Sequence, residues 1–367
     1  MKISFLSGAY QNAGDFLIEK RAIQLIKHVF PEAKINKYLR NQISNHITEI
    51  NDADAVIFGG GPLYKTNLDG YLPLNKCIND ITPPMMILGC GWCGLSGNDE
   101  ICYQYKFNSN TFEFLKKIDN EGLGLGCRDL YTVKILKNLG LKNVFMTGCP
   151  AWYGLDYKQD FEQEALKKDD IINKIAVSDP AKPINFENAL LLVKYLKEKF
   201  TNSEIIFIFH RKQDNPKHET ARIELSQKIE KLGVKIKDIS MNHEGFEQYD
   251  QCDLHIGFRV HAHIYNLSHK KKTILIEEDG RGAGVNQALG IPSLKAYNFI
   301  AQIPNKYIRK ICKVFYSDRN KHLIEDVNSY LDLMQFSRWK YLKNAYVMQD
   351  EYLLNMVSFI KRLENKI

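Results

Sequence analysis

Short apolar segments alternate with helical patterns along most of the chain, in two series that a polar stretch separates. The first series predicts strands at Lys2–Leu6, Ala55–Phe58, Met86–Leu88, Gly124–Cys127 and Val144–Met146. The second predicts strands at Ile175–Val177, Ile205–Phe209, Val234–Ile236, Leu254–Gly257 and Thr273–Ile276. Alternation of this kind is typical of parallel sheets with helices on both faces. We therefore expect an α/β protein with two Rossmann-like domains.

The length of 367 residues also fits two domains better than one compact core. We expect an N-terminal domain at residues 1–150 and a C-terminal domain at 171–297, with the charged stretch around 156–170 as a linker or surface insertion. Residues 298–367 read as helices that brace the two domains. The carboxyl ends of both sheets would then face a central cleft. Two helix starts are expected at N-caps, Asp15 and Asp129.

The amino-acid composition is typical of a soluble globular protein. Hydrophobic residues make up 44% and charged residues 25%, as in soluble globular proteins, and no apolar run reaches the roughly 18 residues of a membrane helix. We therefore expect a cytoplasmic protein. The net charge of +7 is too modest to call for a nucleic-acid partner. Residues 301–367 hold 12 Lys/Arg against 7 Asp/Glu, a balance of +5, so these helices either rest on an anionic membrane surface or present a solvated face.

The eight cysteines show no disulfide-like clustering and read as reduced thiols. Cys90 and Cys93 form one C-x-x-C motif, but a zinc site usually needs a second pair, and none exists. We expect no metal site.

The strand expected at Leu254–Gly257 runs into Phe258-Arg259-Val260-His261-Ala262-His263. Arg259 and His261 would therefore lie where a strand passes into a helix, the place where α/β proteins hold ligands. An arginine fork suits a phosphate or carboxylate, and a histidine can move a proton. The alternative is that Arg259 caps a neighbouring helix and that His261 and His263 are buried structural histidines.

Other strand exits carry similar residues. Asn12, Gly14 and Asp15 precede or begin a helix, whose free N–H groups favour an anion or a sugar hydroxyl, and Gly59–Gly61 let a ligand approach the backbone. Neither segment matches a Walker A or dinucleotide fingerprint, so each could also be a simple turn. The later exits supply Arg211 as a second cation, and Asp279 with Arg281, which could equally form a local ion pair.

In order along residues 1–295, several segments resemble the polysaccharide pyruvyl transferase family. They are Asn12–Asp15, Gly59–Gly61, Cys127–Asp129, Gly148–Ala151, Gly257–Ala262 and the Asp279 loop ahead of Leu289–Pro292. Two places depart from the family pattern. Val177-Ser178-Asp179-Pro180 stands where members commonly have Ser-hydrophobic-Arg, and Arg281 would replace a lysine near position 279.

The resemblance implies a GT-B-like fold with an acceptor-side N-terminal domain and a donor-side C-terminal domain. It also implies transfer of the enolpyruvyl group of phosphoenolpyruvate to two hydroxyls of one sugar, giving a pyruvate ketal. Its R-x-H element maps onto Arg259 and His261. We expect Arg259 to clamp the donor, His261 to be the general acid or phosphate partner with a near-neutral pKa, and Asp15 or Asp279 to be the acceptor-side base. Further substrate contacts are expected from Asn12, Gly14, Gly60, Gly61, Arg211, His263 and Arg281.

The reaction needs no redox cofactor or metal, although a divalent cation could assist phosphate binding. The acceptor would be a sugar of a cell-surface polysaccharide precursor, and the basic tail favours a lipid-linked oligosaccharide at the inner membrane face. Two other readings stay open: a GT-B glycosyltransferase with a nucleotide-sugar donor, and a carbohydrate-binding or assembly protein without turnover. Arg259→Ala is expected to abolish transfer and leave the fold intact.

Overall fold

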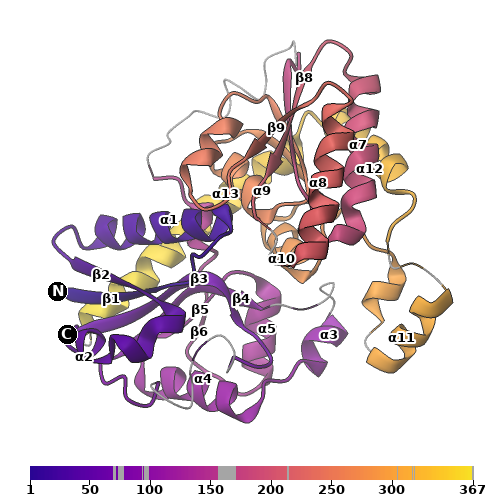
Figure 1. Cartoon of the computed structure of the whole chain (residues 1–367). Coiled ribbons are helices and arrows are strands. Elements are labelled where there is room, and N and C mark those ends of the chain that lie inside the picture. Colours follow the sequence, from indigo (N-terminus) through magenta and orange to yellow (C-terminus); the bar gives the residue numbers. More distant parts are fainter. Residues whose placement is uncertain are drawn as a thin grey trace.

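In the computed structural model, the described residues are 1–68, 72, 78–92, 94, 99–155, 171–212, 215–303, 305–315, 317 and 319–365. They form two parallel sheets with helices around them (Figure 1). The first sheet has the order β2-β1-β3-β4-β5-β6, and its strands in chain order are Lys2–Ser7, Lys34–Leu39, Ala55–Tyr64, Met85–Trp92, Gly124–Cys127 and Val144–Met146. The second has the order β11-β10-β7-β8-β9, with β7 to β11 at Lys174–Ser178, Glu204–Phe209, Lys235–Asp238, Leu254–Gly257 and Lys272–Leu275. The predicted α/β fold class is confirmed.

The helices of the first half are α1 to α5: Ala13–Val29, Ile47–Asn51, Asp99–Gln104, Ser109–Glu121 and Leu130–Asn138. Those of the second half are α7 to α10: Phe186–Lys199, Pro216–Glu230, Val260–Ser268 and Gly280–Leu289. The C-terminal segment holds α11 to α13: Lys306–Phe315, Leu323–Phe336 and Lys340–Lys361. Short 3₁₀ helices η1 to η6 lie at Arg40–Asn45, Pro150–Trp152, Pro183–Asn185, Glu244–Tyr249, Phe299–Gln302 and Arg362–Asn365.

One strand was missed by the sequence reasoning. Strand β2 forms the edge of the first sheet and is mostly exposed or half-buried, so its sequence Lys-Ile-Asn-Lys-Tyr-Leu has no continuous apolar run. Strands β3 and β4 extend well past their predicted ends at Phe58 and Leu88. Gly59–Gly61 belong to β3, which pairs with β4 through Gly59 and Gly61, and this corrects the expectation that these glycines follow the end of the strand.

The start of α1 also differs from the prediction. Asn12 is the N-cap, and Asp15 is the third residue of the helix. The Asp15 amide donates to the Asn12 carbonyl at 2.9 Å, and the two side chains also hydrogen-bond. An acidic residue in the first turn of a helix is favoured by the partial positive charge of the helix N-terminus, as a capping residue is, and this explains the error. The predicted cap Asp129 is confirmed, because its side chain accepts from the Thr132 amide.

The start of α1 joins the two halves of the molecule. The Ala13 amide donates to the His210 carbonyl at 3.0 Å, and the Met241 amide donates to the Gln11 carbonyl at 2.9 Å. Ala13 follows β1, and His210 follows β8. These bonds hold the carboxyl end of one sheet against the carboxyl end of the other.

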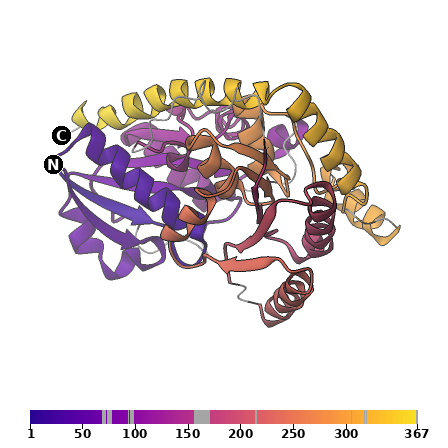
Figure 2. The same cartoon turned by 90° about the horizontal axis from the view of Figure 1, so that it is seen from above.

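Helix α13 runs along both halves and packs against α1 and β6 as well as α9 and α10 (Figure 2). At one end the Tyr346 hydroxyl donates to the Lys271 carbonyl at 3.1 Å. At the other, Arg362 Nε donates to the Leu123 carbonyl at 2.8 Å, and the Phe359 ring packs on Phe145. Within the described ranges, none of the helices combines the length and the apolar content that a membrane span requires.

Candidate functional site

A pocket of about 420 Å³ lies between the carboxyl ends of the two sheets. Its walls include seven of the residues predicted from the sequence, which come from both halves of the chain: Asn12, Asp15, Arg211, Arg259, His261, Asp279 and Arg281. Three helices begin at this pocket, because Asn12, Arg259 and Asp279 are the N-caps of α1, α9 and α10. Helix N-termini carry partial positive charge, so all three favour a negatively charged ligand.

The lining side chains carry a surplus of positive charge. Three carboxylates, Asp15, Glu278 and Asp279, face six basic residues: Lys65, Arg128, Lys182, Arg211, Arg259 and Arg281. The sequence reasoning did not assign Lys65, Arg128 or Lys182 to the site. Each follows a strand, β3, β5 or β7, within four residues, so the rule that found Arg259 could have found them. The pocket suits a ligand with more than one negative charge.

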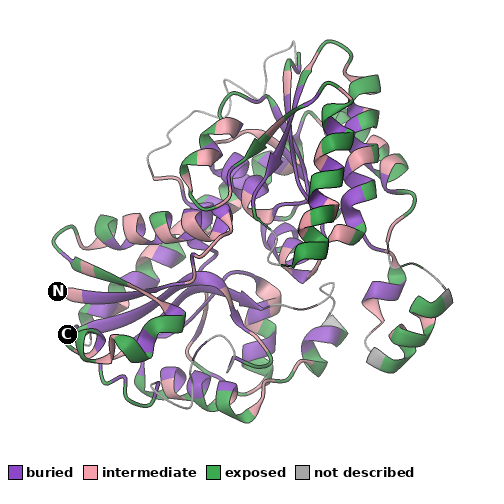
Figure 3. Ribbon diagram, viewed as in Figure 1, coloured by how far each residue is buried: buried purple, intermediate pink, exposed green. Residues whose placement is uncertain are grey.

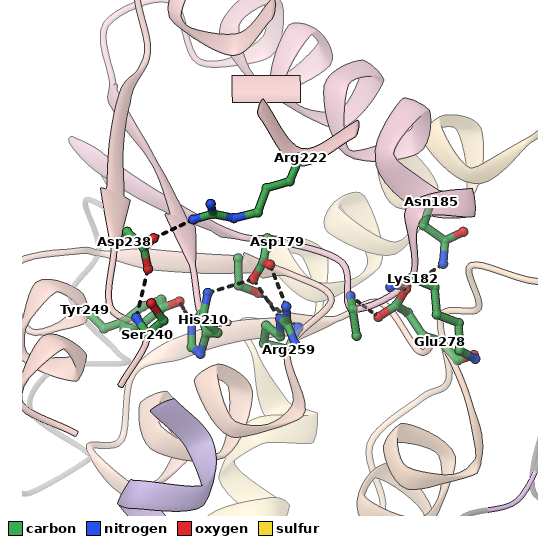
Figure 4. Close-up of polar contacts among 12 residues, drawn as sticks. Asp179, Lys182, Asn185, His210, Arg222, Asp238, Ser240, Tyr249, Arg259 and Glu278 are labelled. Atoms are coloured by element: carbon green, nitrogen blue, oxygen red, sulfur yellow. Dashed lines mark hydrogen bonds and ion pairs between the residues drawn. The ribbon is translucent and has the colours of Figure 1, made fainter. Parts of the chain in front are cut away.

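Arg259 is held rigidly by an acidic partner behind the pocket wall. Its Nε and Nη2 donate to the two carboxylate oxygens of Asp179 at 2.7 and 2.5 Å (Figure 4). The Arg259 amide donates to Ser178 Oγ at 3.1 Å, and the Arg259 side chain is 10% exposed. Removing one partner of such a buried pair costs about 3–5 kcal/mol. Arg259→Ala should therefore destabilise the protein, which corrects the expectation that the fold would be unaffected.

His261 is the second residue of α9 and projects into the pocket. Burial lowers its pKa to about 3, and the cations Arg128, Arg281 and Arg259 act in the same direction. The imidazole is therefore neutral with only the protein's own charges around it, whereas the sequence reasoning assumed a near-neutral pKa. Gly14 lies directly against this ring: a Cβ there would fall 2.8 Å from His261 Cε1 and closer still to Nδ1. Gly14 thus makes room for His261 and does not line the pocket itself.

The pKa values of two carboxylates in the pocket, Asp15 and Asp279, are shifted in opposite directions. Burial raises the pKa of Asp15, against the hydrogen bond from Asn12 and the charge of Arg281. Burial alone would also raise the pKa of Asp279, but Arg281, at 2.8 Å, and Lys182 hold it well below its ordinary value. Asp279 also caps α10. Asp15 is therefore the better placed of the two to exchange a proton, and Asp279 stays ionised.

The model of the polysaccharide pyruvyl transferase family matches residues 12–280. The chain belongs to this family. No curated protein matches its sequence.

Solved structures show the fold that this pyruvyl transferase family member shares with other proteins. UDP-GlcNAc 2-epimerase from Neisseria meningitidis, bound to UDP-GlcNAc, has a TM-score of 0.58 at 11% identity and covers 100% of both chains. A putative UDP-N-acetylglucosamine 2-epimerase from Listeria monocytogenes has a TM-score of 0.54 at 8% identity, covering 93% of this chain and 90% of its own. Anabaena HepE, in complex with UDP and glucose, has a TM-score of 0.51 at 12% identity over 100% and 98% of the two chains. This likeness places the chain in the GT-B fold.

Glu278 organises the loop after β7 in this pyruvyl transferase family member. Its carboxylate accepts from the amides of Ala181 and Lys182 at 2.6 and 3.2 Å and from Asn185 Nδ2 at 2.7 Å, while its carbonyl accepts from Lys182 Nζ at 2.9 Å (Figure 4). The carboxylate is thus occupied by the loop. Through these bonds Glu278 positions Lys182 at the pocket.

The remaining predicted residues lie outside the main pocket. Gly60 and Gly61 have φ of 61° and 77°, which favours glycine, and they line a small adjoining cavity together with Asp15. His263 does not line the pocket: it is fully buried, and its Nδ1 bonds to Thr273 Oγ1 at 2.9 Å. His263 is therefore a buried structural histidine, which was the alternative considered from the sequence.

The C-x-x-C motif does not form a described site. Cys90 lies in β4, where it is fully buried and donates to the Gly60 carbonyl, and burial raises its pKa to about 12. Cys93 lies outside the described residues. Among the residues that the structure describes, no three side chains of the metal-ligating types gather in one place.

Proposed function

We propose that this protein transfers the enolpyruvyl group of phosphoenolpyruvate to two hydroxyls of one sugar, releasing inorganic phosphate and forming a cyclic pyruvate ketal. The family membership supports the reaction class. The observation that carries the proposal is the pocket, in which the Arg259–His261 element meets five further basic side chains near the start of three helices and faces Asp15 from the other half of the chain. The N-terminal half would hold the acceptor and the C-terminal half the donor.

The donor carries a phosphate and a carboxylate, so it needs two cationic clamps. Arg259 supplies one, with its guanidinium plane fixed by Asp179. Arg128, almost fully buried, and Arg281 supply the second from opposite sides of the pocket. Where other family members commonly have Ser-hydrophobic-Arg, this chain has Ser178-Asp179-Pro180, and we propose that Lys182, two residues after Pro180, provides the missing positive charge.

The bond changes balance without an oxidant or a metal. One proton adds to the methylene carbon of the donor, which becomes a methyl group, and the central carbon becomes electrophilic. The first sugar hydroxyl adds to this carbon, the bond to the phosphate oxygen breaks, and the second hydroxyl adds in its place. Of the two protons that the hydroxyls lose, one replaces the proton given to the methylene and one leaves on the phosphate.

Two residues are assigned to these proton transfers. The negative charge of the donor would offset the field of Arg128, Arg281 and Arg259, so His261 would gain a proton when the donor binds and could then give it to the methylene. Asp15, whose pKa burial raises, would take the proton of the attacking hydroxyl. A divalent cation could assist the phosphate, but the proposal does not depend on one.

The second candidate is a glycosyltransferase with a nucleotide-sugar donor. It is favoured by the fold neighbours solved with UDP-GlcNAc or with UDP and glucose, at 11% and 12% identity. A nucleotide site usually needs a carboxylate for the ribose, yet two of the three lining carboxylates, Glu278 and Asp279, are engaged by protein donors, which leaves Asp15 for that role. This observation favours phosphoenolpyruvate.

Ligand-induced stabilisation tests the donor. Melting temperatures would be measured with phosphoenolpyruvate and with a panel of nucleotide sugars, because a ligand that binds only the folded state raises the melting temperature. Arg259→Lys is the informative variant, since it keeps a positive charge beside Asp179 and loses the two-pronged fork. We expect stabilisation by phosphoenolpyruvate that weakens in Arg259→Lys. Stabilisation by a nucleotide sugar alone would overturn the donor assignment.

A further inference from the structure

Helix α11 exposes large apolar side chains along one side. Ile308, Ile311 and Val314 are 51%, 62% and 77% exposed, and Tyr307 is exposed as well. Their spacing of three or four residues puts them on the same side of a helix. Phe299, in η5 next to α11, is also 71% exposed. Aliphatic and aromatic side chains of this size are usually buried, and a contiguous exposed group marks a binding surface.

The other side of α11 is basic. Arg309, Lys310 and Lys313 occupy it, and the sequence of the helix contains no acidic residue. Lys310 and Lys313 are exposed, and Arg309 Nη1 donates to the Ile303 carbonyl at 2.9 Å, which ties the helix to the segment before it. An apolar side flanked by lysine and arginine is the pattern of helices that lie in the surface of a membrane.

The position of α11 leaves this surface accessible. Figure 1 shows α11 at the edge of the molecule, apart from both sheets, and the turned view in Figure 2 keeps it at the outer end. Figure 3 shows that much of the described surface of α11 is exposed. None of the residues named above lines the pocket between the sheets. A ligand of α11 would therefore not compete with the donor or the acceptor.

We propose that α11, together with Phe299, docks on the surface of an anionic membrane. The apolar side chains would enter the boundary between headgroups and acyl chains, and Lys310 and Lys313 would contact the anionic headgroups. Charge complementarity selects this partner. Self-association through the apolar sides would leave the basic sides facing water, whereas an anionic membrane surface meets both the apolar and the basic side of the helix.

Docking through α11 would hold the protein at a membrane surface. Its link to a lipid-linked sugar acceptor rests on the proposed function, whereas membrane binding itself does not. Vesicle binding is measured without turnover. If the protein binds vesicles but does not use phosphoenolpyruvate, only the proposed function is refuted. If it uses phosphoenolpyruvate but does not bind vesicles, only the docking is refuted.

Co-sedimentation of the full chain with vesicles tests the proposal. One vesicle preparation contains phosphatidylcholine alone, and the other contains phosphatidylcholine and phosphatidylglycerol in equal parts. We expect binding to the anionic vesicles that weakens as salt is added. The double variant Ile311→Glu, Val314→Glu should weaken binding by about tenfold or more. The two wild-type side chains are transferred from water into the membrane on binding, and the glutamates cannot replace this contribution. Lys310→Glu should weaken binding about fivefold or more.

Matched controls separate docking from general effects. Leu354→Glu changes an apolar residue of α13 that is 71% exposed, and Lys228→Glu changes an exposed lysine of α8. Both controls should bind like the wild type. Equal binding by the α11 variants and the controls, or no binding of the wild type to anionic vesicles, would overturn the proposal. So would a wild-type dimer in sedimentation analysis that Ile311→Glu converts to a monomer, because α11 would then bind a second copy.

Discussion

Replacing Gly14 with alanine should disable the pocket and leave the fold intact. Gly14 is the second residue of α1, has no positive φ and lies against the imidazole of His261. Alanine suits a helix better than glycine by about 0.5–1 kcal/mol, so the backbone would accept the change. The added methyl group would instead occupy part of the volume of the His261 ring.

The displacement of the ring can be gauged from the distances. The new Cβ would lie 2.8 Å from His261 Cε1 and nearer to Nδ1 and Cγ, whereas carbon atoms in contact are separated by about 3.5–4.0 Å. The ring must therefore move by roughly 1 Å or more. A misplacement of that size in a reacting group lowers the rate about a hundredfold. We expect kcat/KM to fall by about that factor, with the melting temperature almost unchanged.

Steady-state kinetics on four proteins would test this reasoning: the wild type, Gly14→Ala, His261→Ala and the double variant. If the methyl group acts by displacing the ring, it should cost little once the ring is absent, so the two effects should not add. Gly154→Ala is the control, because a Cβ there would lie no closer than 3.2 Å to the end of Arg21 and 3.5 Å to Ser268 Oγ. Additive effects in the double variant, or unimpaired activity of Gly14→Ala, would refute the argument.

Three further predictions concern the charged groups of the pocket. Binding of phosphoenolpyruvate should take up a proton at neutral pH, because the donor raises the pKa of His261 from about 3; calorimetry in buffers of different ionisation enthalpy measures this uptake, which His261→Ala should lack. Asp15→Asn should lower kcat by about a hundredfold or more with little loss of stability, and full activity would remove Asp15 from the proton transfers. The pKa of Asp279 is lowered in the folded protein, so its stabilising effect is present above its unfolded pKa of about 3.9 and is lost as the pH falls further. At neutral pH, Asp279→Asn should therefore be less stable than the wild type by about 1 kcal/mol and melt at a lower temperature. The difference in melting temperature should shrink in acid. A difference that does not vary with pH would contradict the ion-pair explanation.

Local patterns in the sequence were sufficient for most of the fold. The ten predicted strands all occur, and most of them are buried apolar runs that local patterning reveals. Strand β2 escaped notice because an edge strand needs no such run. Gly59–Gly61 were placed after the end of the strand because glycine occurs more often in loops than inside strands. At the helix starts, Asp129 was identified correctly, and Asp15 was confused with the true cap Asn12.

The sequence by itself determined the order of the strands and helices, and that Arg259, His261, Asp279 and Arg211 stand at strand exits. These features depend on residues that are neighbours in the sequence, so local sequence patterns predict them. Only the tertiary structure decided what each side chain does there. Asp179 and Arg259 are 80 residues apart in the chain yet form a buried pair, and Gly14 and His261 meet only because the two sheets face each other. Burial and charge are sums over all neighbours in space, which is why the low pKa of His261 and the opposite settings of the two carboxylates appeared only once the halves were packed together.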